Sequence, residues 1–224
     1  MEPLLIFFLL ALVFSIIIHE VSHGYIAEFL GDPTARLQGR LTLNPIPHID
    51  MVGTILVPGF LLFLQAGFLF GWAKPVPYNP YNLRNQRWGE AMVAGAGPVV
   101  NILIALIFGL VVRFGEGVLP QDFILLAGVI VFINVLLAFF NMLPIPPLDG
   151  SKVLRAFLPF RAELAFQRFE GMLMRGGLFL TLLIFFVLIM MFGQYFFMLL
   201  NALFWVFTGM NLGMLCPVMP WMCG

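Results

Sequence analysis

The chain has 224 residues, of which 62% are hydrophobic and only 10% are charged, and its 11 basic residues balance its 11 acidic residues. A soluble domain carries about 25% charged residues, so this composition excludes a protein whose whole surface faces water. The balanced charge gives no indication of a nucleic-acid partner. The chain is expected to be an integral membrane protein surrounded by the lipid bilayer.

Five hydrophobic runs follow one another along the chain, at about 3–30, 51–70, 91–113, 123–141 and 178–212. A spanning helix needs about 20 apolar residues, and the last run is long enough for two helices with a break at Gly193-Gln194. The first run is expected to be a retained helix, because it lacks the basic N-terminal region and cleavage site of a signal peptide. The predicted fold class is an all-α polytopic membrane protein with about five to six transmembrane helices and a re-entrant or extended membrane-associated segment.

The basic residues predict the orientation of the chain in the membrane. Cytoplasmic loops are enriched in lysine and arginine, which assigns every basic residue except Arg113 to the cytoplasm. Loops 31–50 and 71–90 then lie on the same side, so run 51–70 is expected to re-enter, or to cross and return as extended chain. An ordinary span is the alternative if the charge bias misleads here. The cytoplasmic set is Arg36, Arg40, Lys74, Arg84, Arg87, Lys152, Arg155, Arg161, Arg168 and Arg175.

The first hydrophobic run contains the pattern His19-Glu20-Val21-Ser22-His23. Residues four apart lie on one helical face, so the two imidazoles can bind one Zn²⁺ while Glu20 takes a proton from water. Ionisable groups in an apolar helix are costly, which favours a functional interpretation. The alternative is a buried polar cluster that only bonds to neighbouring helices. The pattern predicts a metal site that activates water.

A catalytic zinc site usually has a third protein ligand, and the candidates are His48, Asp50, Glu90 and Asp149. Asp149 follows a proline-rich stretch that ends an apolar helix, and by topology it lies on the same side as the end of the His19–His23 helix. An ordinary turn aspartate at a helix stop is the alternative. From this segment alone both interpretations stay open.

Two other features have simple structural interpretations. Small residues at 94–97 favour close helix packing, and Asn101 is expected to bond between helices rather than to take part in chemistry. The spacing of Cys216 and Cys223 is not that of a usual zinc site, and both are expected to be unpaired near a membrane surface.

The chain resembles the site-2 protease family of intramembrane zinc metalloproteases, in particular minimal bacterial and archaeal members without a PDZ or CBS domain. The resemblance rests mainly on HEVSH at 19–23 and NMLPIPPLDG at 141–150. It covers about residues 15–155, and only hydrophobicity matches beyond them. The supporting stretches are GRLTLNP at 39–45 with HID at 48–50, GWAKPVP at 71–77 and AGPVVN at 96–101.

The resemblance implies a role for each matching residue. His19, His23 and Asp149 would hold one Zn²⁺ per chain, Glu20 would be the general acid and base, and Asn141 would orient substrate or stabilise the oxyanion. Residues 37–50 and 72–82 would be candidates for a membrane-embedded β-hairpin or sheet that pairs with an unfolded substrate segment. His48 would line the site or act as a transient fourth ligand, although a packing or hydrogen-bonding role in its loop is favoured.

The function that these residues predict is regulated intramembrane proteolysis of transmembrane protein substrates by one protease domain, 1–224. Its catalytic core would be about 1–155, with additional C-terminal helices at about 178–212. The expected location is a prokaryotic cell (inner) membrane, with the active site accessible from the cytoplasm. A metal transporter with the same ligands and a non-catalytic scaffold that binds helices are the alternatives. A Glu20→Gln variant separates the protease from the transporter, because hydrolysis needs the base and transport does not.

Overall fold

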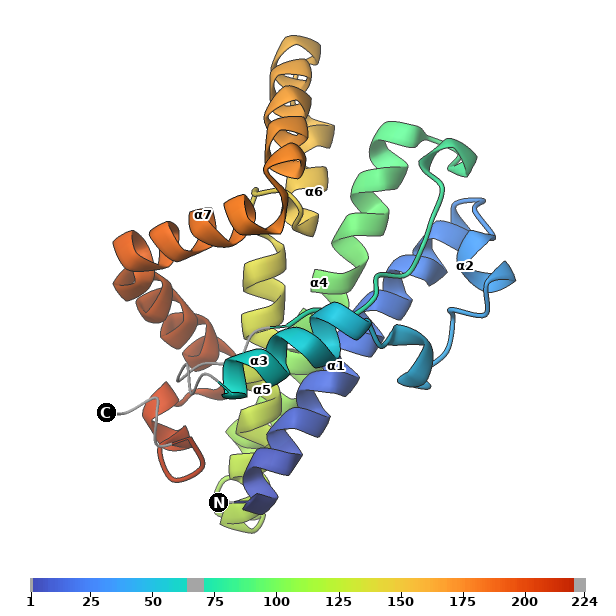
Figure 1. Ribbon diagram of the computed structural model, residues 1–224. Coiled ribbons are helices and arrows are strands. Elements are labelled where there is room, and N and C mark those ends of the chain that lie inside the picture. The colour runs from blue at the N-terminus through green and yellow to red at the C-terminus, as the bar shows by residue number, and fades with distance from the viewer. Residues whose placement is uncertain (1, 64–70, 220–224) are drawn as a thin grey trace.

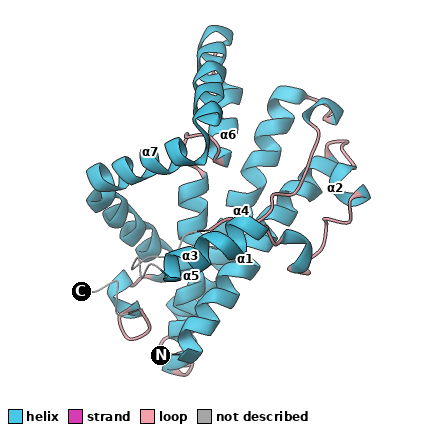
Figure 2. Cartoon of the chain, viewed as in Figure 1, coloured by secondary structure: helices cyan, strands magenta, loops and turns pink. Residues whose placement is uncertain are grey.

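The computed structural model describes residues 2–63 and 71–219 of the chain. Helices joined by loops make up this part of the chain, and no strand occurs among these residues (Figure 2). The shorter elements are a π-helix, η2 (Met51–Leu56), and the 3-10 turns η1 (Ile46–His48), η3 (Pro80–Asn82) and η4 (Leu212–Leu215). The α-helices are α1 (Glu2–Phe29), α2 (Thr34–Leu37), α3 (Val57–Phe63), α4 (Gln86–Gly115), α5 (Gln121–Asn141), α6 (Asp149–Phe157) and α7 (Phe160–Thr208).

Four helices in the described part of the chain are long and apolar enough to cross a bilayer. They confirm the predicted all-α polytopic membrane fold. The five to six helices expected from the sequence included run 51–70 and a second helix in 178–212, neither of which adds a span among the described residues. The four candidate spans are Leu4–Phe29, Gln86–Gly115, Gln121–Asn141 and Met190–Thr208.

The helices α1, α4 and α5 pack along one another, and α7 lies against α4 and α5 (Figure 1). Small residues let these backbones come close in a membrane. A Cβ on Gly109 of α4, for example, would lie 2.9 Å from the carbonyl oxygen of Phe207 in α7. The start of α4 is set by Asn85, whose side chain accepts the N–H of Trp88 as an N-cap. The N-terminus and the α4–α5 turn lie at one end of the bundle, and α2 lies at the other (Figure 1).

Run 51–70 is described as far as residue 63, where η2 and α3 together supply 13 helical residues. That length is short of the roughly 20 residues that a span needs. The chain also returns to its starting point, because the Trp72 N–H donates to the Gly53 carbonyl over 3.1 Å and Lys74 N–H to the His48 carbonyl over 2.9 Å. The two ends of the run therefore lie together, and the run does not carry the chain from one side of the bundle to the other.

The last apolar run belongs to the 49-residue helix α7. A straight helix of that length would be about 74 Å long, more than twice the hydrocarbon thickness of a bilayer. The backbone stays helical through Gly193-Gln194, so the break expected there is not formed, and the residue with a non-helical backbone is Gly177 (φ 66°). Figure 1 shows α7 changing direction along its length.

The C-terminal segment corrects one expectation. Cys216, which follows η4, is disulfide-bonded, so the prediction of an unpaired cysteine at this position is wrong. Spacing alone could not indicate this, because a disulfide depends on how closely two cysteines approach in space and not on their separation in sequence. Cys223 lies outside the described residues.

Candidate metal centre

The pattern on α1 places two imidazoles and a carboxylate inside the bundle. His19 and His23 are buried, with 4% and 8% of their surfaces exposed, and their ring centroids lie 4.7 Å apart. One ligand atom from each of His19, Glu20 and His23 fits within 4.8 Å of the others. This is the closeness that a four-residue helical spacing predicts.

Asp149 contacts these histidines although it lies 130 residues after His19 in the sequence. Its Oδ2 lies 3.1 Å from His19 Nε2 and 3.3 Å from His23 Nε2. Asp149 is the first residue of α6, directly after the proline-rich turn that follows α5. The next residue, Gly150, packs on the backbone after α5, where a Cβ would lie 2.6 Å from the Leu143 carbonyl oxygen. A glycine here lets the turn close tightly enough to bring the carboxylate to α1.

The other side of the two rings is held by α4. His23 Nδ1 lies 2.6 Å from the carbonyl oxygen of Val93, and His19 Nδ1 lies 2.5 Å from Asn101 Oδ1. Gly97 lies under His19, and a Cβ there would be 2.5 Å from Nε2 of the ring. The sequence assigned Gly97 and Asn101 to helix packing, yet both lie against His19. The signal that could have found them is their spacing, since 93, 97 and 101 share one face of a helix.

The arrangement of donor atoms fits a divalent metal ion. The Val93 carbonyl can only accept, so His23 Nδ1 carries a proton and Nε2 of the neutral ring presents a lone pair. Without a cation, the lone pair of Nε2 would face the carboxylate oxygen of Asp149, and the two would repel each other unless a ring carried a second proton between them. A metal ion takes the place of that proton. Tetrahedral zinc with donors at about 2.0–2.1 Å requires donor atoms about 3.3 Å apart. The Nε2–Oδ2 separations of 3.1 and 3.3 Å match this requirement.

The charge state of Asp149 also suits a cation. Burial opposes ionisation, but hydrogen bonding and charge interactions with His19 and His23 outweigh it and hold the pKa of the Asp149 carboxyl below its ordinary value. The group is therefore a carboxylate at neutral pH, which is the form that binds a metal.

An extended segment at 71–79 passes beside the centre. The Val76 N–H donates to Glu20 Oε2 over 3.0 Å, and Asn79 N–H donates to Asp32 Oδ2 over 2.6 Å. The Arg40 guanidinium donates to the carbonyls of Lys74 and Pro75. The segments 37–50 and 72–82 thus lie together, as irregular chain rather than as regular strands in the described residues (Figure 2).

The remaining candidate ligands are engaged elsewhere. His48 is buried and its ring lies 2.9 Å from the Thr42 carbonyl through Nε2. Asp50 caps η2 through its carboxylate, and Glu90 pairs with Arg155. Asn141 donates to the Leu137 carbonyl of its own helix over 3.0 Å. Within the described residues, no hydrogen bond joins His48 or Asn141 to the three converging side chains.

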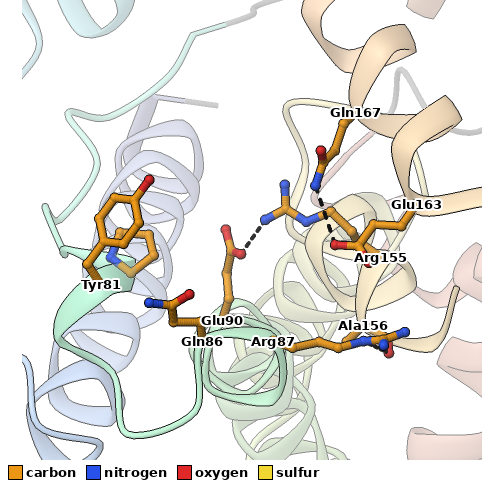
Figure 3. A pocket seen from close by; sticks show the side chains of 9 residues that line it. Tyr81, Gln86, Arg87, Glu90, Arg155, Ala156, Glu163 and Gln167 are labelled. Carbon is orange, nitrogen blue, oxygen red and sulfur yellow. Dashed lines mark hydrogen bonds and ion pairs between the residues drawn. The ribbon is translucent and has the colours of Figure 1, made fainter. Parts of the chain in front are cut away.

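Charged residues of α4 hold α6, and with it Asp149. Arg155 of α6 pairs with Glu90 of α4 and lies 3.5 Å from Glu170 of α7. Arg87 of α4 donates to two carbonyls at the end of α6, those of Ala156 and Leu158. Figure 3 shows Arg155 pointing toward Glu90. The pair lies beside a cavity of about 390 Å³ lined by residues of η3, α4, α6 and α7.

Comparison with known proteins identifies the class of this centre. Residues 116–184 match the model of peptidase family M50. The candidate zinc metalloprotease YwhC of Bacillus subtilis is 37% identical over 188 residues, which cover 78% of this chain and 80% of that protein. The candidate zinc metalloprotease Rip2 of Mycolicibacterium smegmatis is 29% identical over 64% of this chain and 54% of its own length.

The similarity extends to archaea. Zinc metalloprotease MJ0392 of Methanocaldococcus jannaschii is 24% identical over 64% of this chain and 32% of its own length. No solved structure matches the chain. The extent of the match to YwhC, together with the family model and the metal-binding cluster on α1, assigns both class and cofactor. The chain is an integral membrane metalloendopeptidase that uses zinc, and it belongs to peptidase family M50, the site-2 protease family.

Proposed function

We propose that the protein cuts peptide bonds within transmembrane segments of other membrane proteins, and so carries out regulated intramembrane proteolysis. His19, His23 and Asp149 would hold the zinc ion, and Glu20 would be the general base. The observation that carries this proposal is the convergence of Asp149 Oδ2 on two Nε2 atoms that belong to a candidate membrane span. The proposal treats 1–224 as one protease domain with its catalytic core in about 1–155.

The chemistry follows from what the residues around the centre can do. Zinc, when bound, supplies Lewis acidity toward water and the scissile carbonyl. Glu20 takes the proton of the attacking water and delivers it to the leaving amine. Its Oε2 is held by the Val76 N–H, which leaves Oε1 to exchange the proton. Hydrolysis by this route needs no covalent intermediate.

A helical substrate must first be opened, because its carbonyls are shielded by the helix's own hydrogen bonds. The extended segment at 71–79 is supported by Glu20, Asp32 and Arg40, and we propose that an unwound substrate lies along it. Asn141 would turn from its own helix toward the oxyanion when substrate binds. His48 would act through its loop, where its backbone carbonyl accepts from Lys74.

The proposed orientation puts the α2 end of the bundle in the cytoplasm of a prokaryotic cell. At the opposite end, Arg113 donates to the Val206 carbonyl near the end of α7, and the disulfide-bonded Cys216 follows that helix. Disulfides persist in oxidising compartments and are rare in the cytosol. The positive-inside pattern and the disulfide therefore support the same orientation, with the metal centre reached from the cytoplasm.

Glu20→Gln tests the proposed reaction. The variant keeps the size of the side chain and the acceptor for Val76 N–H but removes the base, so cleavage of a transmembrane peptide in proteoliposomes should fall by about a hundredfold or more. Zinc content should stay at the wild-type level. The matched control is Glu28→Gln, two turns further along α1, where the carboxylate pairs with Arg36 outside the centre. Full cleavage by Glu20→Gln would sink the proposed mechanism.

The proposed orientation has a separate test with one cysteine added at each of two sites that are 80% exposed, Leu37→Cys and Val118→Cys. The wild type gives the background labelling of its two own cysteines. A membrane-impermeant maleimide applied to intact cells should label position 118, and position 37 only after lysis. The reverse pattern would overturn the proposed orientation.

A further inference from the structure

A chain of buried polar side chains runs from the metal centre into the membrane interior. Asn101 Nδ2 of α4 donates to Asn134 Oδ1 of α5 over 2.7 Å. Asn134 Nδ2 in turn donates to Ser15 Oγ over 3.0 Å and to the Ile130 carbonyl over 2.9 Å. Both asparagines are fully buried. At its other end the chain reaches His19 Nδ1 through Asn101 Oδ1.

The direction of these hydrogen bonds is set by one backbone group. The Ile130 carbonyl can only accept, so the amide nitrogen of Asn134 must face it and its oxygen must face Asn101. Asn101 must then turn its own NH₂ toward Asn134 and its oxygen toward His19. An oxygen facing Nδ1 requires a proton on that nitrogen. Each step leaves one orientation that pairs every donor with an acceptor.

We propose that Asn134 and Asn101 are positioning residues that commit His19 to the tautomer with a proton on Nδ1. This inference rests on the proposed role of His19 as a zinc ligand. In that tautomer, Nε2 presents its lone pair toward Asp149 and the metal position, 3.1 Å from Oδ2. The other neutral tautomer would set the lone pair of Nδ1 against the oxygen of Asn101.

The hydrogen bonds from Asn134 through Asn101 to His19 form a relay, and the membrane setting makes this relay effective. Water cannot readily reach a fully buried asparagine to satisfy an atom left unpaired, and an unpaired polar group in an apolar environment is costly. A reversed amide would therefore break two or more hydrogen bonds at once. Outer partners of metal-binding histidines typically change metal affinity by about 10- to 100-fold when they are removed.

The tautomer of His19 is the direct readout. Nitrogen-15 NMR of the metal-free protein should show a proton on Nδ1 of His19, the nitrogen that faces Asn101 Oδ1. The signal is assigned by its loss in His19→Gln, since the chain has only three histidines. A His19 ring without a proton on Nδ1 would overturn the proposal.

Asn134→Leu extends the test to zinc affinity. Leucine keeps the branched shape of the side chain, and position 134 makes no hydrogen bond to His19, so a residue that only fills space would leave the centre unchanged. The relay instead predicts mixed tautomers and zinc binding about tenfold weaker in chelator competition. Wild-type affinity and an unmixed tautomer would overturn the relay.

The control is Thr208→Val, which removes a buried hydrogen bond to the Phe204 carbonyl outside the centre. Its zinc affinity should match the wild type. The relay and the proposed function fail separately. A protein with Nδ1–H on His19 that cuts no peptide refutes only the function, and a protease whose His19 lacks the proton on Nδ1 refutes only the role of the two asparagines.

Discussion

Gly97→Ala should disable the centre by adding a single methyl group. The new Cβ would lie 2.5 Å from Nε2 and 2.7 Å from Cδ2 of His19. Non-bonded carbon atoms prefer separations of about 3.5–4.0 Å, so the imidazole or the helix must move by about 1 Å. The ring is also tied to Asn101 and lies against Asp149, so it cannot move without loosening one of these contacts.

The size of the effect follows from the displacement. Overpacking a well-packed site costs about 1–3 kcal/mol, which corresponds to about 5- to 150-fold at 1.36 kcal/mol per tenfold. Misplacing a catalytic group by about 1 Å can cost about a hundredfold in rate. We therefore expect kcat/KM for a transmembrane peptide to fall by about a hundredfold, with weaker zinc binding in chelator competition.

Gly95→Ala is the matched control. It adds the same methyl to the same helix, but nothing lies within 4 Å of its Cβ position. Alanine is favoured over glycine in a helix by about 1 kcal/mol, so this variant should be at least as stable and fully active. Wild-type cleavage and zinc affinity in Gly97→Ala would refute the close approach of α4 to His19, and equal losses in both variants would point to a general effect of alanine in α4.

Asp149→Ala removes one of the three proposed ligands, so zinc content measured by atomic absorption should fall well below one per chain together with cleavage. Normal zinc and normal cleavage in this variant would transfer the role to another residue, with His48 the first to examine. Arg155→Leu leaves Glu90 and Glu170 facing each other without their cation, at side chains about one-fifth exposed. We expect a cost of about 1–3 kcal/mol after allowing for solvent screening, seen as a lower Tm in detergent. Removing the Glu90 charge as well, in Glu90→Gln/Arg155→Leu, should recover part of it, and a double variant no more stable than the single would contradict the pairing.

Much of the molecule could be predicted from local patterns. The spans follow from the length and polarity of the apolar runs, and the pairing of His19 with His23 follows from the pitch of a helix. The basic residues on both sides of run 51–70 predict that this run is not an ordinary span. The hydrogen bond between Gly53 and Trp72 agrees, because it holds the two ends of the run together. The pairing of Cys216 and the helical continuity through Gly193 could not be predicted, because both depend on tertiary contacts rather than on composition or spacing.

The membrane setting, the two imidazoles on one face of the first helix and the carboxylate between them follow from local sequence, because these properties depend on residues a few positions apart. Which acidic group meets the histidines depends on long-range packing. Asp149 is 130 positions from His19, and it arrives there because α5 ends in a turn that Gly150 allows to close. The structure likewise shows that Asn101 contacts His19 in addition to its hydrogen bond with Asn134 of α5. The orientation of that amide is set by the Ile130 carbonyl on another helix, a constraint that no spacing within α4 can express.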